Sequence, residues 1–210
     1  MKDKADQRLR IGFLASGNGS SARAIVEAIA AGEIGAEAVV MVSNSRKAPA
    51  LDWARAAGLA AHCIPTAADP SAADAQLAQI MSQARVGLII LSGYLRRLGR
   101  QTLARYAGRI LNIHPGPLPA FGGQGMYGRR VHEAVVAAGV TQSGMTIHLV
   151  DEEYDHGPVV AERSVPVRPE DTAESLEARI KALEPAFFVE TLKAVSEGRL
   201  RLPSISDNIP

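Results

Sequence analysis

Short apolar segments alternate with helical segments through the first half of the chain, and this alternation constrains the fold more than any other feature. The apolar runs occupy residues 11–15, 38–42, 60–64 and 86–91. The segments with helical spacing occupy residues 22–31, 48–57 and 72–84. Strands separated by helices at this spacing predict a parallel sheet with right-handed crossovers, flanked by helices.

The second half of the chain departs from this alternation. A strand is predicted at residues 109–113, followed by a loop rich in proline and glycine at 115–128 and a helix at 131–138. Two more strands are predicted at 144–150 and 158–167, with an acidic turn between them. We therefore expect an α/β fold with a Rossmann-like, mostly parallel twisted sheet and an antiparallel extension in the C-terminal half.

A long helix is predicted near the C-terminal end. Asp171 and Glu174 have the spacing of a pair that caps a helix N-terminus. The apolar residues that this helix is expected to bury are Leu176, Ile180, Leu183 and Phe187. Because no repeat or low-complexity linker interrupts the chain, we expect one domain over residues 10–202, with lobes meeting at about residue 108 and tails at 1–9 and 203–210.

Composition and charge exclude several classes of protein. A net charge of +1 gives no field that would steer nucleic acid to the chain. No stretch of about 18 apolar residues is present, and the first residues do not resemble a signal peptide. The single cysteine, Cys63, cannot form an internal disulfide and fits a reducing compartment. We expect a soluble cytoplasmic protein that binds small molecules and neither nucleic acid nor membrane; whether it is a monomer or a homodimer stays open.

A glycine turn at residues 17–22 fits the pattern G-x-G-x-x-G/A between a strand and a helix. Glycines let backbone N–H groups approach an anion, and a helix N-terminus favours negative charge, so the turn indicates a phosphate site. A tight turn that binds nothing has the same pattern. No Asp or Glu ends the second strand, as an NAD site requires, although residues 43–46 fit an NADP 2′-phosphate and leave an NADP-dependent oxidoreductase open.

Asn112 and His114 lie where a predicted strand meets the long loop, and strand alternation places them on one face. An amide can hold an oxyanion, and an imidazole can donate or accept a proton near neutral pH. A nearby carboxylate would raise the pKa of the imidazole, and Asp155 in the acidic turn is the candidate. Each residue taken alone has a structural alternative, because a histidine often ends a strand and Asp-x-Gly is common turn chemistry.

Several motifs, taken in order, resemble the folate-dependent formyltransferase family. They are Ser-Gly-Asn-Gly-Ser at 16–20, Ser-Gly-Tyr-Leu-Arg at 92–96, the segment 106–115 that ends in Asn-Ile-His-Pro, Leu-Pro-Ala-Phe at 118–121, Thr-Ile-His at 146–148, Val-Asp-Glu at 150–152 and Asp-His-Gly-Pro at 155–158. The resemblance covers residues 10–202. It implies transfer of the formyl group of 10-formyltetrahydrofolate, a co-substrate, to the amine of 5-phosphoribosylglycinamide, a step of purine biosynthesis.

The resemblance also implies roles for individual residues. Asn112 would polarise the formyl oxygen, His114 would donate the proton and Asp155 would raise the pKa of His114. The residues that match phosphoribosylglycinamide contacts are Asn18, Gly19, Ser20, Ser21, Lys181 and Glu184. The residues that match folate contacts are Leu95, Arg96, Arg97, Leu98, Val150, Asp151, Glu152 and Asp155. The bond between Leu118 and Pro119 matches a cis peptide, and no Cys/His cluster offers a metal site.

Three positions depart from the family pattern. Ser21 stands where the family usually has Asn, no Arg occurs at 68–71, and residues 123–128 match only some members. The nearest rival is a formyltetrahydrofolate hydrolase, which shares the three residues and normally has an N-terminal regulatory domain that we do not expect here. Methionyl-tRNA formyltransferase adds a C-terminal domain and a basic surface, which we also do not expect. A phosphate-binding module without catalysis would leave the three polar residues unexplained.

Overall fold

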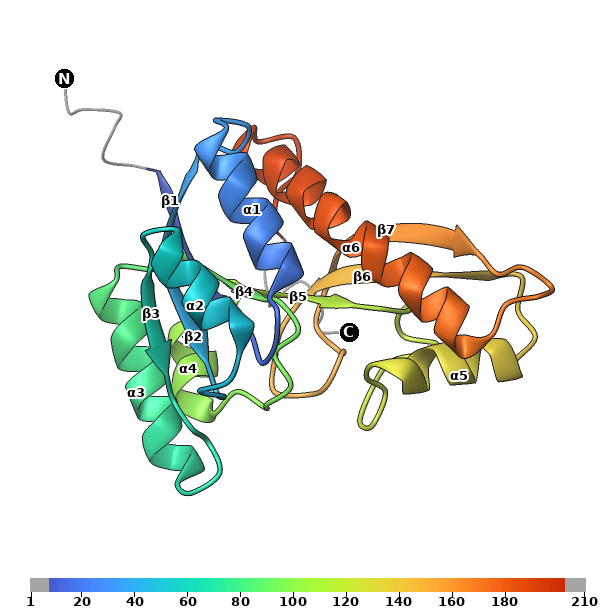
Figure 1. Ribbon diagram of the computed structural model, residues 1–210, viewed down its shortest axis with the longest axis horizontal. Helices are drawn as coiled ribbons and strands as arrows, with labels where there is room; N and C mark the ends of the chain where they lie inside the picture. The colour runs from blue at the N-terminus through green and yellow to red at the C-terminus, as the bar shows by residue number, and fades with distance from the viewer. Residues whose placement is uncertain (1–7, 203–210) are drawn as a thin grey trace.

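The computed structural model describes residues 8–202, which form one seven-stranded sheet with helices on both faces (Figure 1). The strands are β1 (Leu9–Leu14), β2 (Ala36–Ser43), β3 (Ala60–Cys63), β4 (Leu88–Leu91), β5 (Ile110–His114), β6 (Gln142–Leu149) and β7 (Val159–Pro166). The helices are α1 (Ser20–Ala30), α2 (Pro49–Ala56), α3 (Pro70–Gln83), α4 (Arg100–Arg105), α5 (Arg129–Ala137) and α6 (Ala173–Ser196). The predicted tails, 1–9 and 203–210, lie outside the described residues except for Arg8 and Leu9, and Leu9 begins β1.

The sheet confirms the predicted fold class. Its strand order is β3-β2-β1-β4-β5-β6-β7, parallel from β3 through β5 and antiparallel at the β5–β6 and β6–β7 pairings. The order reverses direction between β1 and β4. In open α/β sheets such a reversal leaves a crevice beyond the carboxyl ends of the strands, where ligands bind.

Two hydrophobic clusters, one on each face, hold the sheet between its helices. One cluster joins α1, α2, α5 and α6 to side chains such as Phe13 and Ile147. The other joins α3 and the segment around α4 to Leu14, Ile89 and their neighbours. Adjacent residues Phe13 and Leu14 fall in different clusters because successive strand side chains point to opposite faces. Among the described helices, none has both the length and the apolar composition that a bilayer crossing requires.

Helix α6 differs from its prediction in two respects. Its N-cap is Thr172, which forms a reciprocal capping box with Ser175, so the predicted pairing of Asp171 with Glu174 is wrong. The Asp171 carboxylate instead pairs with Arg179, a tertiary ion pair that the local pattern did not show. The helix buries the predicted core positions except Leu183, which is 37% exposed.

The loop at residues 115–128 has no helix or strand, as predicted. The peptide bond between Leu118 and Pro119 is cis, as the resemblance implied. The hydroxyl of Thr146 on β6 donates to the Gly116 carbonyl over 2.9 Å and accepts from the N–H of Leu118 over 3.3 Å. These bonds fasten the loop to the sheet beside His114.

Candidate active site

Strand β5 presents Asn112 and His114, two residues apart, on one face of the sheet. Its antiparallel neighbour β6 places His148 opposite Asn112 and Thr146 opposite His114. The Nδ2 atom of Asn112 lies 3.1 Å from Nε2 of His148. Pairing of the two strands thus brings an amide and two imidazoles together at the carboxyl end of β5.

Asp155 comes from the turn between β6 and β7, where its backbone has a φ of 56°. Its Oδ2 atom lies 3.4 Å from Nδ1 of His114, and its Oδ1 atom lies 3.5 Å from Nε2 of His148. The N–H of Gly123 donates to Oδ2 over 3.1 Å. The structure therefore brings Asn112, His114 and Asp155 together, with His148 as a fourth member; we call these four residues the polar cluster.

The environment of Asp155 favours its ionised form. Burial raises the pKa of this carboxyl, since the side chain is only 11% exposed. The hydrogen bond with His148, the charge of His114 and the N–H of Gly123 act in the opposite direction and outweigh burial. The pKa of Asp155 lies below its ordinary value, so the group is a carboxylate at neutral pH.

His114 lies behind the cleft wall, with 2% of its surface exposed. Its Nε2 atom lies 2.7 Å from the carbonyl oxygen of Phe121; because a carbonyl can only accept, Nε2 carries a proton. Burial lowers the pKa of the imidazole, and His148 lowers it further, while Asp155 and the Phe121 carbonyl raise it. Asp155 thus acts in the predicted direction, but the expectation that it leaves the imidazole with a raised pKa is wrong, because desolvation outweighs the carboxylate and the net shift is downward.

His148 belongs to the Thr-Ile-His motif, for which the sequence predicts no separate role, yet it lines the cleft together with Asn112 and Asp155. Its Nδ1 atom lies 2.9 Å from the carbonyl oxygen of Leu149, so Nδ1 carries a proton. The sequence does contain a pattern that indicates this residue. If the strand with Thr-x-His pairs antiparallel with β5, its histidine lies opposite the asparagine of Asn-x-His. Nδ2 of Asn112 has two hydrogens, so one can reach His148 while the other faces a ligand oxygen.

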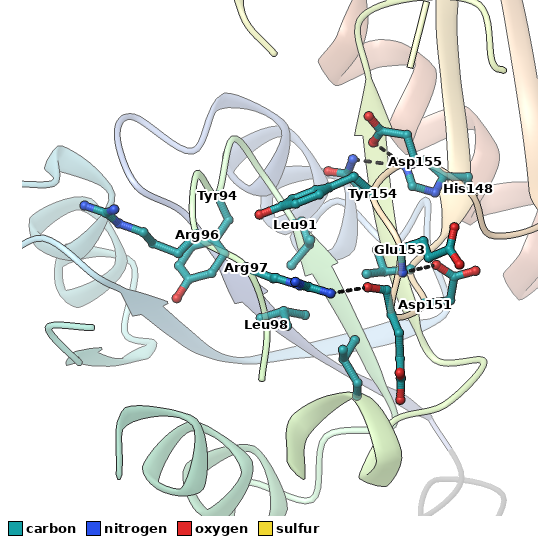
Figure 2. A pocket seen from close by; sticks show the side chains of 14 residues that line it. Leu91, Tyr94, Arg96, Arg97, Leu98, His148, Asp151, Glu153, Tyr154 and Asp155 are labelled. Atoms are coloured by element: carbon teal, nitrogen blue, oxygen red, sulfur yellow. Dashed lines mark hydrogen bonds and ion pairs between the residues drawn. The ribbon is translucent and has the colours of Figure 1, made fainter. Parts of the chain in front are cut away.

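A cleft opens beside the polar cluster, between the segment that follows β4 and the turn that follows β6 (Figure 2). Seven of the eight predicted folate contacts line it: Arg96, Arg97, Leu98, Val150, Asp151, Glu152 and Asp155. Leu95 is the exception, because its side chain points to solvent and is 68% exposed. Further lining residues are Leu91, Tyr94, Leu103, Glu153 and Tyr154.

The walls of the cleft combine apolar side chains with a larger number of polar and charged ones. Arg97 reaches across the cleft and donates from Nη2 to the Glu152 carbonyl over 2.6 Å (Figure 2). Its guanidinium also lies 5.6 Å from the centroid of the Tyr154 ring.

The glycine turn, residues 17–22, follows Ser16 beyond the carboxyl end of β1. Gly19 has φ 63° and ψ 43°, and a Cβ atom there would lie 3.2 Å from Cβ of Ala50 and 3.3 Å from Cβ of Ala15. Within residues 8–202, the N–H groups of Ser20 and Ser21 have no hydrogen-bond acceptor, whereas the N–H of Ala22 donates to the Ser92 hydroxyl. Free N–H groups at a helix N-terminus favour an anion.

Lys181 and Glu184 lie on α6, which packs beside α1 (Figure 1). Lys181 pairs with Glu177 over 2.6 Å, and no hydrogen bond between described residues joins it to the glycine turn. Glu184 is half-buried; burial raises the pKa of its carboxyl to about 7, with Lys181 opposing and Glu177 adding to the shift. The structure thus sets these two residues on the neighbouring helix without joining them to the turn.

The fold and the site define a Rossmann-like α/β protein in which acid–base groups, a cleft and a turn suited to anions share one edge of the sheet. The chain matches the family described as formyl transferase over residues 9–192, and it belongs to that family. Within the part of the chain that the structure describes, no group of three His, Cys, Asp or Glu side chains is arranged to hold a metal ion.

Relatives agree over most of the chain. A chloroplastic phosphoribosylglycinamide formyltransferase of Vigna unguiculata is 38% identical over 92% of this chain, which spans 63% of that relative's length. The phosphoribosylglycinamide formyltransferase of Haemophilus influenzae is 34% identical over 92% of this chain and 90% of its own. Among solved structures, glycinamide ribonucleotide transformylase 1 of Symbiobacterium toebii has a TM-score of 0.85 and 36% identity, and the alignment covers 96% of this chain and 92% of that one.

Proposed function

We propose that this protein transfers the formyl group of 10-formyltetrahydrofolate to the amine of 5-phosphoribosylglycinamide. The observation that carries the proposal is the polar cluster, in which Asn112, His148 and Asp155 face a cleft next to a turn with free N–H groups. The names of the relatives agree with this activity. Within one domain over residues 10–202, the proposal assigns binding of the substrate phosphate to the lobe up to about residue 108. It assigns catalysis and the folate site to the lobe from about residue 109.

The proposed reaction begins when the free amine attacks the formyl carbon, forming a C–N bond and a tetrahedral intermediate with negative charge on oxygen. Nδ2 of Asn112 donates to that oxygen. The bond between the formyl carbon and N10 of the folate then breaks, N10 gains a proton and the former ammonium loses one. Asp155, ionised and lining the cleft, accepts the proton that the ammonium loses.

His114 supplies the proton to N10 in this proposal, and its Nδ1 atom, 3.4 Å from Oδ2 of Asp155, takes up the proton that Asp155 has accepted from the ammonium, so the ring is not left as an anion. Because its Nε2–H donates to the Phe121 carbonyl, that proton reaches the folate only through a water molecule or after the bond to Phe121 opens. Nε2 of His148 lies near both Asn112 and Asp155 and bonds to one of them at a time: with a lone pair it accepts from the amide, and with a hydrogen it donates to the carboxylate. General acid catalysis of this kind contributes about 10²–10⁴-fold to a rate.

The proposed binding contacts divide between the two substrates. Asn18, Gly19, Ser20 and Ser21 hold the phosphate, while Lys181 and Glu184 contact the same substrate from α6. The cleft residues hold the pterin end of the folate, and Leu95 lies at the rim of that cleft. We further propose that the protein is cytoplasmic and is either a monomer or a homodimer.

A direct test mixes the protein with 10-formyltetrahydrofolate, with and without 5-phosphoribosylglycinamide, and follows release of tetrahydrofolate. The proposal predicts release that depends on the amine, with one formylated amine formed for each tetrahydrofolate. Release at the same rate without the amine would assign the protein to the hydrolase class instead. A parallel fluorescence titration with NADPH should show no saturable binding.

A further inference from the structure

Ser16 lies at the carboxyl end of β1, between the two strands that flank β1 in the sheet. Its neighbours in space therefore include the segments that follow β2 and β4. The first of these begins with Asn44, and the second carries residues 92–98, one wall of the cleft. A residue at this point directly precedes the glycine turn in the chain and can bond to both the loop after β2 and the wall of the cleft.

The hydroxyl of Ser16 uses both of its hydrogen-bonding functions on these neighbours. It donates to Oδ1 of Asn44 over 2.6 Å and accepts from the N–H of Leu95 over 2.8 Å. The backbone N–H of Ser16 also donates to the carbonyl of Gly93 over 3.1 Å. Ser16 therefore ties the glycine turn to the cleft wall through two hydrogen bonds and to the loop after β2 through a third.

Tyr94 and Leu98 pack the two ends of the segment 92–98 against a core cluster, but Leu95, Arg96 and Arg97 between them are exposed, so the bonds from Ser16 fix the wall at this point. A segment with few buried contacts has a low local stability, so its hydrogen bonds to the rest of the protein govern its position. In the glycine turn, Asn18 and Ser20 are exposed, whereas Gly19, Ser21 and Ala22 are buried.

We propose that Ser16 is a positioning residue that couples binding of phosphoribosylglycinamide at the glycine turn to binding of folate in the cleft; this inference rests on the proposed function. A ligand that fixes either segment also fixes Ser16, and Ser16 then holds the other segment in its binding arrangement. Binding of the second ligand consequently costs less conformational entropy of the protein, because the segment that it contacts is already ordered. Such coupling is reciprocal, so each ligand tightens the other by the same factor.

The test measures that factor by calorimetry in a complex that cannot react. Phosphoribosylglycinamide is titrated into the protein with and without saturating tetrahydrofolate, under exclusion of oxygen; tetrahydrofolate has no formyl group to transfer. For the unmodified protein we expect the dissociation constant to fall at least about 5-fold when tetrahydrofolate is present. In Ser16→Ala the ratio should approach 1, whereas Ser16→Thr, which keeps the hydroxyl, should restore it.

Ser45→Ala is the matched control, because among residues 8–202 the Ser45 hydroxyl accepts only from the nearby N–H of Lys47. It should keep the coupling of the unmodified protein. If Ser16→Ala does not fold, as judged by its thermal melt, Asn44→Ala replaces it, because this variant frees the Ser16 hydroxyl from its acceptor and should weaken the coupling. Unchanged coupling in the folded variant overturns the inference, as does a ratio near 1 in the unmodified protein. Failure of phosphoribosylglycinamide to bind the unmodified protein at all would instead overturn the proposed function on which the inference rests.

Discussion

The polar cluster and the glycine turn lie at the same edge of the sheet, but they differ in how their polar atoms are satisfied. In the polar cluster, the two imidazoles and the carboxylate all have partners within the protein. At the glycine turn, the N–H groups of Ser20 and Ser21 have none among residues 8–202. The comparison teaches that a group held by the protein is oriented for chemistry, whereas a group left free is available to bind a ligand.

The largest expected effect of a single change falls on the carboxylate of the polar cluster. Asp155→Ala removes the partner of both His114 and His148, so we expect turnover to fall by about 10²–10⁴-fold. Steady-state kinetics with both substrates saturating measures this change. Asp52→Ala, which removes an exposed carboxylate on α2, serves as the control and should keep full turnover. Near-normal turnover in purified Asp155→Ala would remove the role assigned to this residue.

The next largest effect is expected at the amide. Asn112→Ala removes the donor to the developing oxyanion, and loss of one such donor usually costs about 10²–10³-fold in turnover. The Michaelis constant for folate should change little, because the donor acts on charge that appears in the transition state. A variant with a raised Michaelis constant and unchanged turnover would make Asn112 a binding residue instead.

A smaller effect is expected at the glycine turn, and it should appear in binding. Gly19→Ala forces a Cβ into a left-handed backbone position with close neighbours, which costs about 1–2 kcal/mol of stability. Displacing the turn should raise the Michaelis constant for phosphoribosylglycinamide about 10-fold, with turnover retained. Gly17→Ala is the matched control, since Gly17 has no positive φ and a Cβ added there would meet no atom within 4 Å. Equal effects of the two substitutions would show that the conformation of Gly19 is not what matters.

The smallest effect concerns Glu184 and the dependence of stability on pH. Its carboxyl has a pKa of about 7 in the folded protein, above the ordinary 4.5, so the folded state favours the protonated form. The stabilisation is present in full below pH 4.5 and is lost as the pH rises through 7. Urea unfolding should show a decline on the order of 1 kcal/mol across this window, since the side chain is only half-buried. Glu184→Gln should abolish the decline, and a decline of unchanged size would place its origin elsewhere.

Much of the fold was predictable because its signals are local. The strands before β5 and the helices α1, α2 and α3 begin within two residues of their predicted positions, since apolar runs and helical spacing mark them directly. Helix α4 is not predicted by the sequence pattern. It has six residues, and its first N–H groups are capped by the carboxylate of Asp74 on α3, 27 and 28 residues away in sequence. Such a distant contact leaves no mark on the local pattern.

The residues that make up the site could be predicted from the sequence, but the hydrogen bonds that orient their side chains could not. Strand alternation put Asn112 and His114 on one face, and the acidic turn between two later strands offered Asp155 as the carboxylate. The hydrogen bond from His114 to the Phe121 carbonyl depends on the path of the loop at 115–128, which no periodicity specifies. The direction of the His114 pKa shift likewise depends on burial, which is a property of the whole packed site.

One measurement tests most directly whether the polar cluster serves the chemistry and the glycine turn serves substrate binding. Calorimetry gives the dissociation constant of phosphoribosylglycinamide for Asp155→Asn and for Gly19→Ala beside the unmodified protein. We predict an unchanged constant for Asp155→Asn, in which turnover should fall as in Asp155→Ala, and a constant raised about 10-fold for Gly19→Ala. An Asp155→Asn protein that binds this substrate as weakly as Gly19→Ala would contradict the account.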